Sequence, residues 1–206
     1  MKGQTVEAWL DELGSSAPAP GGGAAGALSA AMAAGLVEMV GNLSVGKGQD
    51  DAALAETVQR AAALRRRAAE LADEDAEVFT AVMAAYKLPR GDDAEKAARR
   101  SAIDAALIGA ARVPLEVATV AAEVVRLCTG IAPLSNPNVL SDVAVSAAAA
   151  RAAVDSSVVN VEVNLASLKD ATARAELAAA VAPYSSGDVQ AEAEQVLAEV
   201  RRRISA

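Results

Sequence analysis

The sequence predicts an all-α fold, a single-domain antiparallel bundle of about six helices that covers residues 1–206. Hydrophobic residues make up 53% of the 206 positions but aromatic residues only 2%, and alanine supplies much of the apolar fraction. Alanine has the highest helix propensity, whereas strands are enriched in β-branched and aromatic residues. No alternating strand pattern of useful length is present. Short connections between the periodic segments favour antiparallel neighbours.

The first three expected helices differ in character. A short amphipathic helix is expected from Thr5 to Leu13, with Trp9 as its anchor. A helix of small residues follows from about Gly22 to Ser44. A long third helix is expected from Asp50 to Lys87, and the proline and glycine within residues 88–91 end it.

Three more helices are expected in the second half of the chain. The fourth runs from Asp93 to Leu127 with a kink at Pro114, because proline removes a helical hydrogen bond. After a loop over residues 129–138, a fifth helix runs to about Ser167 and is apolar almost all round, as expected of a central helix. The last, exposed and amphipathic, is expected from Ser186 to Ile204.

The charge balance limits the class of partner. A net charge of −8 argues against nucleic acids and anionic membranes, because both bind basic surfaces. The single cysteine, Cys128, excludes an internal disulfide and fits a reducing compartment. No leader pattern opens the chain, so we expect a cytoplasmic protein. The apolar run Gly21–Val37 is short for a membrane span and meets Glu38, which favours a soluble helix.

The absence of histidine from the sequence restricts the chemistry. Without histidine and with one cysteine, zinc sites and catalytic triads based on histidine are unavailable within the chain. Catalysis would rest on carboxylates, lysine, tyrosine, hydroxyls, amides and backbone dipoles. We therefore expect neither a metal nor a bound cofactor.

Three consecutive glycines, Gly21, Gly22 and Gly23, stand where the second helix begins. Glycine permits close approach of the backbone and is costly in entropy to order. This pattern indicates a ligand contact or an oligomer contact and does not distinguish them.

Residues 41–47 match the first seven positions of a phosphate-binding loop. The eighth position is Gly48 instead of serine or threonine, and the segment ends a helix instead of joining a strand to a helix. We interpret it as a helix C-terminus with Gly46 as the cap and Lys47 opposing the dipole. Lys47 remains a candidate contact for an anionic ligand.

An acidic residue interrupts the apolar stripe of the third helix. The stripe includes Leu71, Val78 and Val82, at alternating spacings of three and four, and Asp75 falls on it. An acid on a buried stripe is costly unless it is paired, hydrogen-bonded or protonated. A functional carboxylate and a structural buried acid are both open at this point.

The fifth helix carries a comparable polar stripe. Ser157, Asn160 and Asn164 recur at spacings of three and four on an otherwise apolar helix. Satisfied core amides and a polar ligand pocket are equally open. At the start of this helix, Ser141 or Asn138 is the expected N-cap.

Several motifs occur in an ordered set from Trp9 to about Ala171. They are Pro20-Gly21-Gly22-Gly23, Met39-Val40-Gly41, Ser44-Val45-Gly46-Lys47, Asp73-Glu74-Asp75-Ala76-Glu77-Val78-Phe79, Tyr86-Lys87-Leu88-Pro89, Val113-Pro114-Leu115, Ser141-Asp142 and Asn160-Val161-Glu162-Val163-Asn164-Leu165. The set resembles the cyclodeaminase/cyclohydrolase family, which comprises the C-terminal domain of formiminotransferase-cyclodeaminase and stand-alone bacterial methenyltetrahydrofolate cyclohydrolases. Many members have serine where this chain has Ala24, and basic or aromatic residues where it has Gly48-Gln49-Asp50.

The resemblance implies an all-α homodimer that acts on a tetrahydrofolate substrate. It maps the catalytic carboxylate, in an Asp-x-Glu-x-Phe motif, onto Asp75. The expected reaction is hydrolysis of 5,10-methenyltetrahydrofolate to 10-formyltetrahydrofolate, with Asp75 as general base. The first alternative is formiminotetrahydrofolate cyclodeaminase, which releases ammonia. The second is a non-catalytic helical dimer that binds folate or only itself.

The other site residues are assigned by chemistry. The glycine loop would offer backbone N–H groups, while Asp142 and the asparagine stripe would bind the pterin edge. The two lysines would bind the anionic glutamate tail. The expected substrate-binding set is Gly21, Gly22, Gly23, Lys47, Lys87, Ser141, Asp142, Asn160 and Asn164.

The sequence also suggests a dimer contact. Gly22, Gly26, Ala30 and Ala34 recur every four residues, which permits close approach of a second helix. We expect this face to pair with another copy of the chain.

Overall fold

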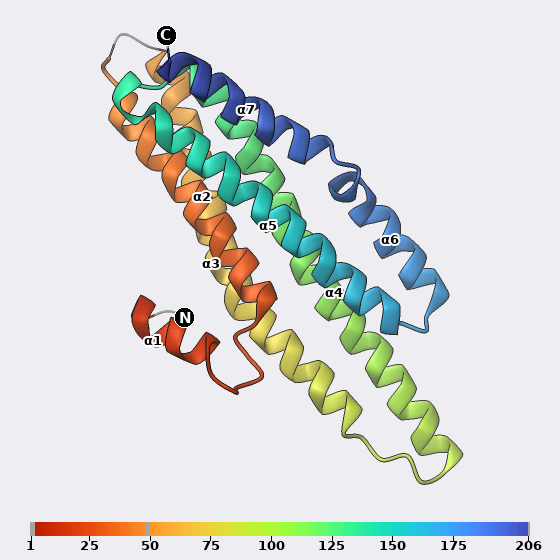
Figure 1. Ribbon diagram of the computed structural model, residues 1–206. Helices are drawn as coiled ribbons and strands as arrows, with labels where there is room; N and C mark the ends of the chain where they lie inside the picture. Colours follow the sequence, from red (N-terminus) through yellow and green to blue (C-terminus); the bar gives the residue numbers. More distant parts are fainter. Residues whose placement is uncertain (1–2, 48–49, 206) are drawn as a thin grey trace.

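The computed structural model describes residues 3–47 and 50–205. Within these ranges the chain is all-helical, with seven α-helices, two short 3-10 helices and no strand (Figure 1). The elements are α1 (Val6–Leu13), α2 (Gly22–Ser44), α3 (Asp51–Tyr86), α4 (Asp93–Ile131), η1 (Ala132–Leu134), η2 (Pro137–Val139), α5 (Leu140–Ser167), α6 (Ala171–Ser185) and α7 (Asp188–Ile204).

Four long helices, α2 to α5, form the body of the elongated bundle, and α7 lies along α5 (Figure 1). Beyond the other helices, α3 and α4 continue as a two-helix hairpin. The short helix α1 lies apart from the bundle axis, with Trp9 half-buried against the core. All six expected helices are present.

A further helix, α6, occupies a segment for which the sequence predicted no helix. Its N-cap is Asp170, whose carboxylate accepts hydrogen bonds from the N–H groups of Thr172 and Ala173 at 3.0 Å each. The helix continues through Pro183 and ends at Ser185. Similarly, α4 continues through Pro114 as one helix. Proline therefore does not end the helix in either of these two sequences.

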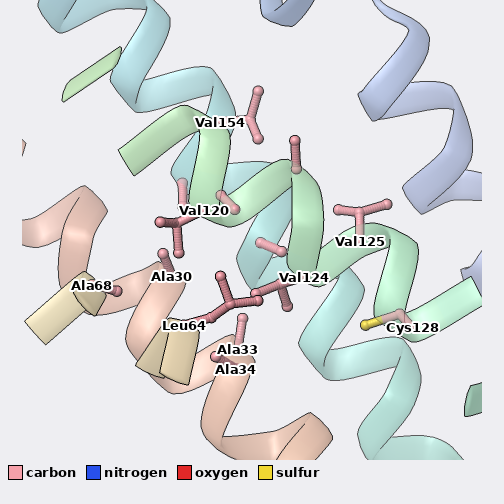
Figure 2. Packing of buried hydrophobic residues seen from close by; sticks show 14 of the residues in the cluster. Ala30, Ala33, Ala34, Leu64, Ala68, Val120, Val124, Val125, Cys128 and Val154 are labelled. Carbon is pink, nitrogen blue, oxygen red and sulfur yellow. The ribbon is translucent and has the colours of Figure 1, made fainter. Parts of the chain in front are cut away.

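The core consists largely of small side chains. Ala30, Ala33 and Ala34 of α2 are fully buried, and Figure 2 shows Leu64 of α3 pointing toward the alanines and toward valines of α4. The hydroxyl of Ser146 donates to the carbonyl of Ala33 at 2.8 Å, which satisfies a buried polar group between α5 and α2. Small residues thus allow α2 to pack closely within its own subunit.

This packing contradicts the expected dimer contact. Gly26, Ala30 and Ala34 are buried inside the subunit, and only Gly22 of that series is exposed. A Cβ atom built on Gly26 would lie 2.7 Å from Oγ of Ser156 on α5. The small-residue face of α2 is therefore used for helix packing within the chain.

The caps at the start of α5 and at the end of α2 differ from the expected ones. The N-cap of α5 is Val139, which makes no side-chain hydrogen bond, so the expected cap at Ser141 or Asn138 is wrong. Asn136 instead accepts from the N–H of Asn138 and starts the 3-10 turn before α5. The C-cap of α2 is Val45, one residue before the expected Gly46. Gly46 has φ +73°, a conformation that favours glycine just after a helix.

Gly48, whose identity argued against a phosphate-binding loop, lies outside the described residues. Gln49, which together with Gly48 and Asp50 differs from many family members, also lies outside them.

By length and composition alone, α2 and the helical stretch Asp93–Leu134 resemble membrane spans, but 50% and 56% of their apolar windows are buried in the bundle. Core helices of a soluble protein have this pattern.

Candidate active site

A cavity of about 340 Å³ opens between the start of α2, the C-terminal third of α3, part of α4 and the end of α5. The glycine loop and Asp75 form one side of its lining, and Asn160 and Asn164 contribute from α5. Apolar side chains of α3, including Phe79 and Val82, complete the wall. The structure therefore brings together three groups that are far apart in the sequence.

Asp75 lies against the first turn of α2. Its Oδ2 accepts a hydrogen bond from the backbone N–H of Ala24 at 3.0 Å. A Cβ atom built on Gly23 would lie 2.0 Å from Oδ1 of Asp75, so the carboxylate occupies the space that any larger residue at position 23 would need. The glycine loop thus permits the acid to approach the N-terminus of a helix, where a negative charge is favoured.

Two opposing effects act on the pKa of Asp75. Burial raises the pKa above its ordinary value, and the hydrogen bond from Ala24 opposes this rise by stabilising the charged form. The result is a half-buried carboxylate with a raised pKa and one open side on a cavity. Such a group is suited to accept a proton from a bound water molecule.

The neighbouring acids of α3 have other surroundings. Glu74 is bound by the guanidinium of Arg67, and Glu77 is exposed. Neither lines the cavity. The position of Asp75 on the apolar stripe is what distinguishes it in the sequence and in the structure.

The two asparagines are anchored through their side-chain nitrogens. Asn160 donates to the carbonyl of Ser156 at 2.8 Å, and Asn164 donates to the carbonyls of Asn160 at 2.8 Å and Ala110 at 3.2 Å. The side-chain oxygens are then the groups suited to accept from a ligand N–H. Ser157, the third member of the predicted stripe, is 3% exposed and belongs to the core.

Four of the expected binding residues do not line this cavity. Asp142 precedes Asn160 by 18 residues on α5, which corresponds to about 27 Å along the helix, and Ser141 is beside it. Lys47 follows the far end of α2. Lys87 comes directly after α3 but does not line the cavity.

Sequence reasoning did not assign the aromatic side chains of the cavity wall to the site. Phe79 and Tyr86 of α3 both line the cavity. The signal was available, because aromatic residues are only 2% of the chain and two of them share this helix. An aromatic wall suits a flat conjugated ligand.

A family model described as formiminotransferase-cyclodeaminase matches residues 5–183. The chain belongs to this family. Its similarity extends to a methenyltetrahydrofolate cyclohydrolase from Methylorubrum extorquens, which is 44% identical over 170 residues that cover 81% of this chain and 82% of the relative.

Other members of the formiminotransferase-cyclodeaminase family are larger or more distant. The formimidoyltransferase-cyclodeaminase of Rattus norvegicus is 33% identical over 81% of this chain, which corresponds to 31% of the relative. The crystal structure of formiminotetrahydrofolate cyclodeaminase from Thermotoga maritima superimposes with a TM-score of 0.82 at 28% identity, covering 99% of this chain and 97% of that chain. The relatives in these comparisons are named as enzymes, which supports an enzymatic function for this chain.

Proposed function

We propose that this protein hydrolyses 5,10-methenyltetrahydrofolate to 10-formyltetrahydrofolate, with Asp75 as the general base. The observation that carries the proposal is the carboxylate of Asp75, which opens on the cavity and is hydrogen-bonded to Ala24 at the start of α2. The 44% identity to a methenyltetrahydrofolate cyclohydrolase, over most of both chains, supports this choice of reaction.

The chemistry of the substrate fits a carboxylate base. The methenyl carbon is an amidinium carbon, so a nearby carboxylate stabilises its positive charge and orients a water molecule. The water oxygen bonds to that carbon as one proton passes to Asp75. The bond to N5 of the pterin then breaks, N5 gains a proton, and the former water oxygen becomes the formyl carbonyl. One proton is released overall.

The remaining groups of the cavity hold the pterin in this proposal. Backbone N–H groups of Gly21, Gly22 and Gly23 meet its acceptor atoms, and the side-chain oxygens of Asn160 and Asn164 meet its N–H groups. The amide nitrogens of both asparagines already bond to backbone carbonyls, which fixes the orientation of each side chain. Pre-oriented groups of this kind reduce the entropy lost on binding.

A cyclodeaminase activity is the alternative reaction at the same site. It forms the methenyl carbon of 5,10-methenyltetrahydrofolate from a formimino group and releases ammonia. The structural likeness to the Thermotoga maritima cyclodeaminase favours this candidate. A non-catalytic dimer that binds folate is the remaining candidate, in which Asp75 would be a structural acid.

The deciding experiment follows the loss of methenyl absorbance with the wild-type protein and Asp75→Asn. We expect hydrolysis above the spontaneous rate and a loss of about 10²- to 10⁴-fold in kcat for the variant, the usual contribution of a general base. Glu77→Gln, an exposed change on the same helix, serves as the control and keeps full activity. Because burial disfavours the charge of Asp75, the Asn variant folds at neutral pH with no loss of thermal stability.

Each other outcome has a defined meaning. If the wild-type protein hydrolyses the methenyl compound no faster than the spontaneous reaction, the proposed cyclohydrolase activity is rejected. If the protein releases ammonia from formiminotetrahydrofolate faster than it hydrolyses the methenyl compound, the cyclodeaminase becomes the preferred assignment. Full activity in Asp75→Asn would leave the reaction in place and reject the role of Asp75.

The proposal includes a homodimer in the cytoplasm, formed through the exposed apolar face of α2 and α5. We name this the α2/α5 face; it comprises Met32, Met39, Leu43, Val145 and Val159, all of them exposed. Exposed apolar patches of this kind mark interaction sites. A second copy fits because a face that carries exposed apolar side chains on two neighbouring helices can pair with itself about a two-fold axis.

A two-fold axis near Met32 gives a role to the distant residues. The cavity lies at one end of α2, and Lys47 and Asp142 lie at the other, about 33 Å away along the helix. Because Met32 is near the middle of α2, the axis brings Lys47, Ser141 and Asp142 of the partner subunit toward the cavity. In this arrangement the two groups of expected site residues meet across the dimer.

A further inference from the structure

A buried proline, Pro114, lies in the interior of α4. In an α-helix each backbone N–H donates to the carbonyl four residues earlier, but proline has no N–H. The carbonyl of Ala110 therefore receives no helical hydrogen bond from position 114. Because Ala110 is buried and an unpaired buried carbonyl is costly, this carbonyl needs another donor.

The side chain of Asn164, on α5, is that donor. Its Nδ2 donates a hydrogen bond to the carbonyl of Ala110 at 3.2 Å. The same nitrogen donates to the carbonyl of Asn160, one turn earlier on α5, at 2.8 Å. Helices α4 and α5 lie side by side (Figure 1), and Ala110 and Asn164 both line the cavity that holds Asp75. The bond therefore joins two walls of the candidate active site.

Two carbonyls together fix the orientation of the Asn164 amide. Its NH₂ group has two hydrogens, and each of them has a carbonyl to bind. Turning the amide over would place Oδ1 against two carbonyl oxygens, which would repel it. For Oδ1 itself, the described part of the chain supplies no donor. Asn164 is therefore held with its acceptor atom available to a ligand.

Asn160 lines the same cavity with less restraint on its amide. Its Nδ2 has one described acceptor, the carbonyl of Ser156 at 2.8 Å. Turning this amide over would break one hydrogen bond, whereas the same change at Asn164 would break two. The two asparagines thus differ by the bond to Ala110, whose carbonyl lacks its helical donor because residue 114 is proline.

We propose that Pro114 is a positioning residue, which fixes Asn164 as an acceptor for an N–H group of the substrate's pterin. This inference rests on the proposed function, because that function places the pterin beside Asn164. A helical N–H at position 114 would compete with Asn164 for the carbonyl of Ala110 and draw it toward the helix axis. Proline is the least favourable residue inside a helix, so position 114 gives up helix stability for a defined binding group.

The first test restores the missing N–H. Pro114→Ala and Pro114→Val both supply it, and alanine is smaller than proline whereas valine is larger. Both variants keep α4 helical, because each gains a helical hydrogen bond. With 5,10-methenyltetrahydrofolate we expect KM to rise about fivefold in both, the effect of losing one neutral hydrogen bond. The kcat stays unchanged, because the contacts of Asp75 are not altered. A rise in only one variant would assign the effect to packing and overturn the inference.

Pro183→Ala is the matched control. Pro183 also lies inside a helix, α6, but it is exposed and does not line the cavity. Its replacement restores a helical N–H in the same way, and no described side chain donates to the carbonyl of Ala179, four residues earlier. We expect wild-type KM and kcat. A rise in KM equal to that of Pro114→Ala would attribute the effect to helix prolines in general and overturn the inference.

A double-mutant cycle tests whether Pro114 acts through Asn164. We expect Asn164→Ala to raise KM at least as much as Pro114→Ala does. In the Asn164→Ala background, the change at position 114 should have no further effect on KM, because the side chain that it positions is gone. Equal effects of Pro114→Ala with and without Asn164 would overturn the inference.

A spectroscopic measurement separates this inference from the proposed reaction. Isotope labelling of the five asparagines allows hydrogen exchange of each side-chain NH₂ group to be followed by NMR without any ligand. The signal of Asn164 is the one lost in Asn164→Ala. We expect its exchange to be about tenfold faster in Pro114→Ala than in the wild type, even if the protein has no hydrolase activity. Equal exchange in both proteins would overturn the inference and leave the cyclohydrolase intact.

Discussion

Gly23 and Asp75 lie so close together that each restricts what the other position tolerates. The carboxylate of Asp75 fills the space beside the Cα of Gly23 and accepts a hydrogen bond from the backbone N–H of Ala24. Gly23 therefore contributes to the site because it has no side chain, which leaves room for the carboxylate of Asp75. The acid gains a hydrogen bond that limits the rise of its pKa on burial.

Gly23→Ala should displace this carboxylate. A Cβ at position 23 would lie 2.0 Å from Oδ1 of Asp75, so the acid or the first turn of α2 must shift. We expect kcat to fall by about 100-fold, since a displacement near 1 Å has this effect on catalytic groups. Steady-state hydrolysis of 5,10-methenyltetrahydrofolate measures it.

Gly109→Ala is the control for this prediction. A Cβ at position 109 of α4 meets nothing within 4 Å, so alanine improves helix propensity and raises stability by about 0.5–1 kcal/mol. Activity should be unchanged. Full activity in Gly23→Ala would show that the contact with Asp75 has no catalytic consequence.

At the scale of elements, an arginine connects two of the long helices. Arg67 of α3 binds Glu116 of α4 through two hydrogen bonds, at 2.6 and 2.8 Å, and also binds Glu74 on its own helix. Hydrogen bonding to Arg67 lowers the pKa of Glu116. The arrangement fixes α3 relative to α4, and hence Asp75 relative to the cavity wall.

Arg67→Ala should destabilise the protein by about 1 kcal/mol at neutral pH, the upper range for a partly exposed ion pair. Because the pKa of Glu116 is lower in the folded than in the unfolded state, its contribution is present above the unfolded pKa. The contribution is lost as pH falls through the lower, folded pKa. Urea unfolding at neutral and acidic pH measures the change, which should shrink in acid.

Arg66→Ala provides the comparison, because Arg66 is an exposed neighbour. We expect it to alter the free energy of unfolding by less than about half as much, at either pH. A pH-independent loss in Arg67→Ala would assign its effect to packing instead of charge.

The elements that the sequence predicted well are those with a long apolar period. For example, α3 and Asp75 on its stripe could be derived because a helix face is a local property. The helix α6 was missed because Leu177 and Val181 are its buried residues, which leaves little apolar period to recognise in the sequence. The face of α2 that carries Gly26 and Ala30 was misassigned because spacing alone does not distinguish a partner subunit from a neighbouring helix.

At the scale of the whole molecule, the α2/α5 face determines assembly in the proposed function. Met32, near the middle of α2, is 63% exposed although it belongs to one of the most apolar helices. A large exposed apolar residue surrounded by others is typical of an interface centre. The two-fold pairing would also determine whether Lys47 and Asp142 reach a cavity.

Met32→Glu should give monomers, because a two-fold contact would bury two such charges close together. Light scattering at micromolar concentration measures the change against a dimeric wild type. Ile204→Glu introduces the same charge at another exposed apolar position, on α7, and should leave the dimer intact. A monomeric wild type would contradict the proposed assembly.

The alanines of α2 also decide where this protein is sensitive to mutation. Truncation to alanine, the usual probe of a core, removes nothing from Ala27, Ala30, Ala33 and Ala34, although all four are fully buried. An alanine scan would therefore be silent at these four positions of α2. The same positions have no room for added methyl groups, and enlarging them forces strain on α3, α4 or α5. The bundle is therefore sensitive to substitutions that add volume at these buried alanines.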